Sequence, residues 1–198
     1  TAYHKQFFNG KKINANFNVI SKNHFGIIED YFLASTIDSI AWSSAVMIPK
    51  KIFRELGGFD ERMRTGEDTD LWIRIALKYK VAFSSKTTSN KILIDPEYHL
   101  SYTAGRMDQM KIIEKFKHLE NNRASFKKYM DLNRFSIALK RKIAGDINTY
   151  RKLKKEIDPI NLNTKQVILL DTPIIIIRTL KKVQFFMLRL NIYLSPFN

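Results

Sequence analysis

Five carboxylates lie within eleven residues in the first half of the chain: Asp60, Glu61, Glu67, Asp68 and Asp70. The last three fall at the expected start of a helix, where unpaired backbone N–H groups and the helix dipole stabilise negative charge. A carboxylate held there, beside the flexible Gly66, suits a general base that takes the proton from an attacking hydroxyl. The alternative is ordinary helix capping by Thr65, Glu67 or Asp68, because acidic first turns are common.

The pattern around these acids predicts an α/β arrangement. The apolar run at 40–48 is typical of a buried strand, and a helix that opens at Pro49 is expected to end at Gly57-Gly58. A helix at 69–79 and strands at 81–85 and 91–95 follow. Upstream, Asn9-Gly10 predicts a hairpin turn and the segment 27–35 has helical spacing.

The second half of the chain has only helical patterns, at 107–121, 133–157 and 173–194. The last begins at Thr172, the expected N-cap, with Pro173 in its first position. We therefore expect an α/β domain over 1–105 and an all-helical extension over 106–198.

The two halves of the chain differ in net charge, and the absence of cysteine excludes several kinds of site. Residues 1–100 hold 14 Lys/Arg and 11 Asp/Glu, whereas residues 101–198 hold 20 and 8, and the chain has no cysteine. Disulfides, thiolate metal sites and cysteine nucleophiles are excluded, which suits a reducing cytoplasm. A basic half suits an anionic partner, although a solvated Lys-rich surface is the simpler alternative.

The acidic cluster belongs to a longer ordered motif that resembles the acceptor-side segment of glycosyltransferase family 2, of the GT-A (Rossmann-like) fold. The matching residues are Ser44-Ala-Val-Met-Ile, Phe53, Gly57-Gly58-Phe59-Asp60-Glu61 and Gly66-Glu67-Asp68-x-Asp70-Leu71-Trp72-x-Arg74. The resemblance covers about residues 1–105 and is sharpest over 43–76. It implies an inverting transfer of sugar from a nucleotide-diphosphate donor to a hydroxyl of a glycan or lipid-linked acceptor, in cell-surface polysaccharide assembly.

The resemblance also implies roles for individual residues. Asp68 matches the catalytic base, while Glu67 matches a residue that orients the loop or touches the acceptor. Trp72 is expected either beneath the acceptor or in the core, and Asp60 is expected to tie its loop to backbone amides. His99 matches the histidine that ligates a divalent Mn or Mg on the donor diphosphate, although the spacing from its tyrosine departs from the family form.

Other family features are not found in this sequence. No Asp-x-Asp metal motif precedes residue 43, and the one at Asp68-Thr69-Asp70 belongs to the base motif. We expect about ninety further residues to carry the donor site, by domain-size norms, and this chain alone to be inactive. The alternative function is a non-catalytic remnant or split-enzyme half that acts as a basic membrane-binding or interaction module.

The helix expected at 173–194 combines a broad apolar face with a stripe formed by Arg178, Lys181, Lys182 and Arg189. Four charges argue against a membrane span and favour a helix in the interface of an anionic membrane. Packing on the catalytic domain is the alternative. Nucleic acid is not expected as a partner, because no recognised binding motif is present. The expected location is therefore cytoplasmic and peripheral, on the inner face of a bacterial membrane.

Overall fold

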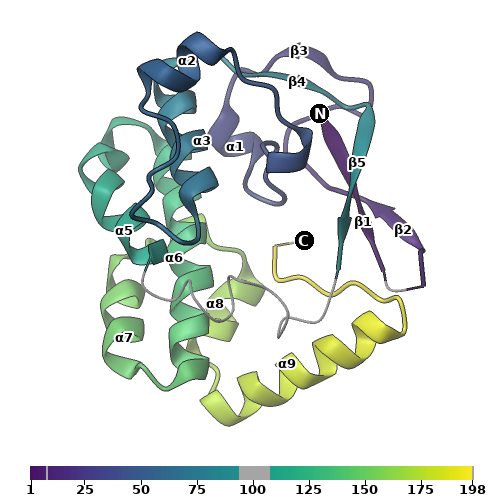
Figure 1. The fold of residues 1–198 in the computed structure, drawn as a ribbon. Coiled ribbons are helices and arrows are strands. Elements are labelled where there is room, and N and C mark those ends of the chain that lie inside the picture. The colour runs from purple at the N-terminus through teal and green to yellow at the C-terminus, as the bar shows by residue number, and fades with distance from the viewer. Residues whose placement is uncertain (8, 94–107, 198) are drawn as a thin grey trace. The chain divides into compact units, whose positions relative to one another are not determined.

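The computed structural model describes residues 1–7, 9–93 and 108–197, and the chain divides into two compact units, Thr1–Lys115 and Phe116–Asn198 (Figure 1). The first unit mixes helices with two small sheets, and the second is helical, as the sequence predicts. The domain boundary expected after residue 105 lies outside the described residues.

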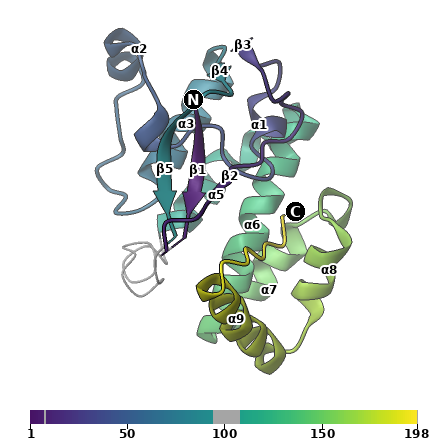
Figure 2. The ribbon, with the colours of Figure 1, turned by 90° about the vertical axis from the view of Figure 1, so that its right-hand side faces the viewer.

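Unit 1 contains a three-stranded sheet of order β2-β1-β5 (Figure 2). Strand β1 (Ala2–Gln6) pairs antiparallel with β2 (Lys12–Asn14) and parallel with β5 (Thr87–Ile92), so that Lys5 lies opposite both Ile13 and Lys91. The turn between β1 and β2 contains Gly10 at φ +85°, which confirms the predicted hairpin. A second sheet pairs β3 (Phe25–Ile27) with β4 (Ala82–Ser84).

Short helices complete the first unit. Helix α1 (Tyr31–Ala34) begins at Asp30, whose carboxylate accepts from the Leu33 N–H. The others are α2 (Lys50–Glu55), α3 (Glu67–Lys78) and α5 (Asp108–Phe116), whose last residue begins unit 2. The core gathers side chains from α1, α3, α5 and β1, with Phe7, Phe32, Leu71, Ile73 and Ile113 essentially inaccessible to solvent.

The strand predicted at 40–48 is wrong. Ser43–Ala45 form a 3₁₀ turn, η1, and the flanking residues pair with none of the described strands. The burial expectation also fails, because Ser43, Ser44 and Met47 are exposed. The Thr1 backbone nitrogen donates to the Ala45 carbonyl over 2.9 Å. A β-favouring composition forms a strand only where a neighbouring strand supplies hydrogen bonds.

Helix α6 (Ala124–Ala144) is the centre of unit 2 and contacts η3 (Lys117–Asn122), η4 (Pro159–Asn161) and three helices. These helices are α7 (Ile147–Glu156), α8 (Thr164–Asp171) and α9 (Ile174–Arg189). The helical pattern over 133–157 is divided between α6 and α7, because Gly145 adopts φ +86° and Asp146 caps α7. Helix α9 ends five residues before the predicted Leu194, and Pro173 rather than Thr172 is its N-cap.

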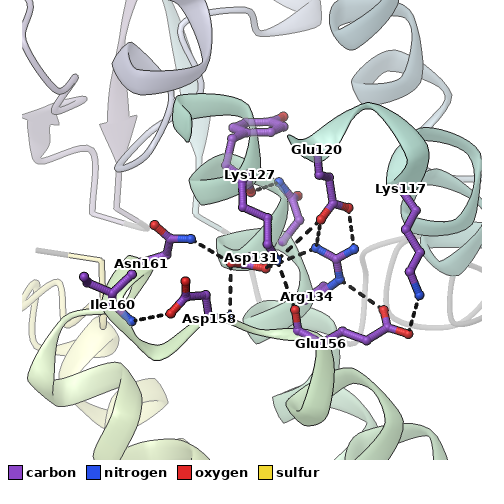
Figure 3. A network of polar contacts seen from close by, with 11 residues as sticks. Lys117, Glu120, Lys127, Asp131, Arg134, Glu156, Asp158, Ile160 and Asn161 are labelled. Atoms are coloured by element: carbon purple, nitrogen blue, oxygen red, sulfur yellow. Dashed lines mark hydrogen bonds and ion pairs between the residues drawn. The ribbon is translucent and has the colours of Figure 1, made fainter. Parts of the chain in front are cut away.

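A buried ion network links η3, α6, α7 and η4 (Figure 3). The Arg134 guanidinium is 1% exposed and pairs with Glu120, Asp131 and Glu156. The second oxygen of Asp131 accepts from the Asp158 N–H at 3.2 Å and the Asn161 amide at 2.8 Å. Each charge in this interior therefore has a partner of opposite sign, as burial requires.

Candidate functional site

The acidic cluster lies at the start of α3, where the sequence places it. Gly66 is the N-cap at φ +82°, and Glu67, Asp68 and Asp70 form the first turn. The N-cap is Gly66, which has no side chain to make a capping hydrogen bond, so the expectation of Thr65, Glu67 or Asp68 as the cap is wrong. Within the first turn, Asp68 does accept a hydrogen bond from the Thr69 N–H. Glycine takes the cap position because it adopts the left-handed conformation without steric penalty.

Asp68 is half-buried and its two carboxylate oxygens have different donors. The Ser43 hydroxyl donates to Oδ2 over 3.0 Å, and the Thr69 N–H and hydroxyl donate to Oδ1 over 2.6 and 3.2 Å. Ser43 belongs to η1, so this turn reaches the helix that carries Asp68. The carboxylate is thereby fixed in orientation and still partly accessible, as a general base must be.

Asp70 has a different environment from Asp68, although only two positions separate them. Its side chain is completely buried and accepts from Arg74 Nε at 2.7 Å and Lys115 Nζ at 2.6 Å. The Arg74 guanidinium also donates to the carbonyl oxygens of Leu56 and Gly58, the latter over 2.7 Å. Asp70 is thus a structural anion that joins α3 to α5, and through Arg74 to the end of α2.

Asp60 ties its own loop, as expected. It accepts from the Arg62 backbone N–H over 3.2 Å and pairs with the Arg62 guanidinium over 2.9 Å. The hydrogen bond from the Arg62 side chain lowers the pKa of Asp60 well below its usual range, against a smaller opposing effect of desolvation. Asp60 therefore stays ionised and constrains the loop that leads to Gly66.

Helix α5 packs against the loop that precedes α3. A Cβ placed on Gly66 would lie 2.9 Å from Ile112 Cδ1, closer than real side chains approach. Lys111 Nζ donates to the Arg62 carbonyl over 2.8 Å. The glycine in the motif thus serves two purposes, because it permits the positive φ and leaves room for α5. Sequence reasoning did not identify this role of α5, since its partners lie 45 or more residues upstream.

Trp72 lies one turn after Asp68, so the two residues share a side of α3. Its side chain is 6% exposed and its ring meets Phe59 edge-on at 6.4 Å between centroids. Among the described residues, neither the buried indole Nε1 nor the buried hydroxyl of Thr65 has a hydrogen-bond partner. The ring is therefore a core residue with an unused donor. Glu67 is the first residue of α3 and is half-buried.

The predicted metal ligand His99 lies outside the described residues. Across residues 1–7, 9–93 and 108–197, no three histidine, aspartate or glutamate side chains come together in a way that would hold a metal ion. The described part of the site therefore consists of a base candidate, its donors and the ion cluster beneath it.

These features agree with the comparison against protein families. A model described as glycosyltransferase like family 2 matches residues 12–136, which include the acidic cluster, α5 and part of α6. The match covers more than half of the chain, so the chain belongs to this family. No curated protein and no solved structure matches it.

Proposed function

We propose that the chain forms the acceptor-side part of an inverting glycosyltransferase, with Asp68 as catalytic base. The enzyme would transfer a sugar from a nucleoside-diphosphate donor to a hydroxyl of a glycan or lipid-linked acceptor. The observation that carries the proposal is the half-buried Asp68 carboxylate, fixed by Ser43 and Thr69 at the start of α3, in a chain of this family.

The proposed reaction has one displacement at the anomeric carbon. Asp68 takes the proton of the acceptor hydroxyl as its oxygen forms a bond to that carbon. The bond between the carbon and the donor diphosphate breaks, and the leaving oxygen keeps the electron pair. The configuration inverts because attack comes from the face opposite the leaving group. Asp68 then carries the proton, which it returns to solvent.

Glu67 and Trp72 are proposed to serve the acceptor. Glu67 begins the helix turn that carries the base, and a half-buried carboxylate there can accept a hydrogen bond from a sugar hydroxyl. The buried indole N–H of Trp72 has no partner among the described residues, and Trp72 lies on the side of α3 that carries Asp68.

A divalent Mn or Mg, with His99 as a ligand, is proposed for the complete enzyme. Such an ion stabilises the charge that develops on a departing diphosphate. Calorimetric titration of the chain with UDP and other nucleoside diphosphates in the presence of Mn tests where the donor binds. Absence of binding supports a donor site formed by other residues, whereas micromolar binding places it within this chain.

The proposed setting is surface polysaccharide assembly at the cytoplasmic face of a bacterial membrane, where lipid-linked acceptors lie. Two observations support a peripheral position: helix α9 has an exposed apolar face, and none of the described helices is long and apolar enough to cross a bilayer. If the chain has no sugar chemistry, this same face favours the second candidate function, a basic membrane-binding module.

The decisive test is Asp68→Asn in the complete enzyme. Incorporation of labelled sugar from UDP-glucose, UDP-galactose and UDP-N-acetylglucosamine into a membrane lipid extract would be measured. We expect turnover to fall by about 10²–10⁴-fold, the contribution of a general base. The matched control is Glu61→Gln, an exposed acid in the same loop, which should retain turnover. Undiminished transfer by the Asp68→Asn enzyme would refute Asp68 as base.

A further inference from the structure

The exposed side of α9 is apolar over most of its length. The apolar residues with large exposed areas on α9 and at its C-cap are Ile175, Ile176, Leu180, Val183, Phe186 and the C-cap Leu190, with exposures from 40% to 75%. At 100° per residue these six positions fall within an arc of about 140°. Ile177, on another side of the helix, is buried, and Arg178 donates to the carbonyl of Ile143 on α6 over 2.9 Å. Within unit 2, one side of α9 is therefore attached to α6, while the other described residues of this unit leave the apolar arc exposed.

Cationic side chains border this apolar arc. Arg178, Lys182 and Arg189 fall within about 40° of one another on the same projection, next to the edge formed by Ile175. All three are exposed. No acidic residue occurs after Asp171 in the sequence. The face thus combines an apolar centre with a border of one charge sign.

We infer that α9 lies in the surface of an anionic lipid bilayer, with its apolar arc among the acyl chains and Lys182 and Arg189 at the phosphate headgroups. The inference rests on the part of the proposed function that places the enzyme at a membrane, but it is independent of the chemistry at Asp68. Helices of this composition bind with the apolar side about 5–10 Å deep in the interface. The long basic side chains reach outward to the headgroups.

The length of α9 agrees with this orientation. Its 16 residues extend about 24 Å, which is shorter than the hydrocarbon core of about 30 Å. The helix therefore lies along the interface. The charge on its border also argues against a second copy of the chain as the partner. Two such faces in contact would bring cations together without any acid on α9 to pair with them, whereas anionic lipid supplies the opposite charge.

Vesicle sedimentation of the 198-residue chain tests the inference. We expect binding to vesicles of phosphatidylcholine mixed with phosphatidylglycerol, weaker binding to phosphatidylcholine alone, and weakening by salt. Phe186→Ser with Leu190→Ser should lower affinity by about tenfold or more, because two apolar anchors are lost. Lys182→Gln with Arg189→Gln should lower it by about fivefold for each charge removed.

Matched controls distinguish binding by this face from nonspecific binding through other exposed apolar residues and from an effect of net charge. Ile160→Ser with Ile168→Ser removes two apolar residues of unit 2 outside α9 that are at least as exposed as Phe186 and Leu190. Arg151→Gln with Lys155→Gln removes two exposed charges from α7. Both pairs should bind vesicles as the unchanged chain does. All the substituted side chains are on the surface, so each variant is expected to fold. Circular dichroism checks this.

Three results would overturn the inference. The first is no binding to the anionic vesicles, and the second is equal loss of binding in the α9 and control pairs. The third is a dimer, seen by ultracentrifugation, that Phe186→Ser with Leu190→Ser converts to monomer, since a second copy would then cover the face. The Asp68→Asn chain should bind vesicles normally, so failure of the membrane inference and failure of the base assignment are distinguishable.

Discussion

Lys115 on α5 donates a hydrogen bond over 2.6 Å to Oδ1 of Asp70 on α3, whose side chain is completely buried. Arg74 Nε pairs with the other oxygen of the same carboxylate over 2.7 Å. One buried anion therefore holds two cations, and through them α5 and the end of α2. Because Asp68 lies two residues away on the same helical turn, the position of the base candidate depends on this cluster.

Asp70→Asn should destabilise unit 1 by about 3–5 kcal/mol, because it leaves two cations without their buried partner. The two tryptophans of the chain, Trp42 and Trp72, both lie in unit 1. Their fluorescence during urea unfolding therefore reports on this unit. Glu61→Gln, in the exposed loop, should change the free energy of unfolding by less than about 0.5 kcal/mol. Equal midpoints for the two variants would contradict a structural role for Asp70.

Gly66→Ala should destabilise unit 1 more than Gly57→Ala does. Both glycines have positive φ, +82° and +78°, so each substitution carries a backbone penalty of about 1–2 kcal/mol. Only at Gly66 would the new Cβ meet another side chain, Ile112 at 2.9 Å, whereas Gly57 has nothing within 4 Å. The difference in tryptophan-monitored unfolding between the two variants isolates the packing of α5. Equal free energies of unfolding for the two variants would mean that α5 moves to accommodate the new Cβ at no energetic cost.

Arg134→Met should destabilise unit 2 by about 3–5 kcal/mol, because Glu120 and Asp131 would remain buried with less positive charge nearby. Amide hydrogen exchange in α6 would show the loss of protection. Arg151→Met, on the surface of α7, is the matched control and should exchange normally. Since unit 2 has no tryptophan, unchanged fluorescence midpoints are expected for both variants, and unchanged exchange in Arg134→Met would refute the importance of the network.

Unit 2 should lose stability as the pH falls below about 4.5, the ordinary pKa of glutamate. Burial acts to raise the pKa of Glu156, but the hydrogen bond from Lys117 and the charges of Lys117 and Arg134 outweigh it, so the pKa is lowered. A carboxyl with a lowered pKa in the folded state stabilises the protein above its unfolded-state pKa. That contribution disappears as the pH falls through the folded-state value.

Urea unfolding followed by far-ultraviolet circular dichroism, at neutral pH and below pH 4.5, checks this pH dependence. Glu156→Gln should flatten the decline that the unchanged chain shows. Asp171→Asn alters an acid that is 65% exposed in its side chain and serves as the control, because exposed ion pairs contribute little. A decline that is equally steep in Glu156→Gln would assign the acid sensitivity to other groups.

Local patterns predicted much of the secondary structure. The hairpin at Asn9-Gly10, the helix after Pro49 that ends at Gly57-Gly58, and α3 all occur where turn residues and apolar periodicity place them. The strand at 40–48 failed, because a strand needs a partner that composition does not reveal. The sequence predicted one helix over 133–157, whereas the structure has two helices that are separated at Gly145. The apolar spacing did not reveal the break, because such spacing can continue in register across two packed helices.

The sequence by itself determined the family, through the ordered motif from Ser44 to Arg74, and it singled out the carboxylates at the start of α3. Only the tertiary structure separated those acids. It buried Asp70 between Arg74 and Lys115, and left Asp68 half-buried against Ser43. Spacing along a helix fixes which direction a side chain points, but its chemistry depends on groups from distant segments, which come together only when the chain folds.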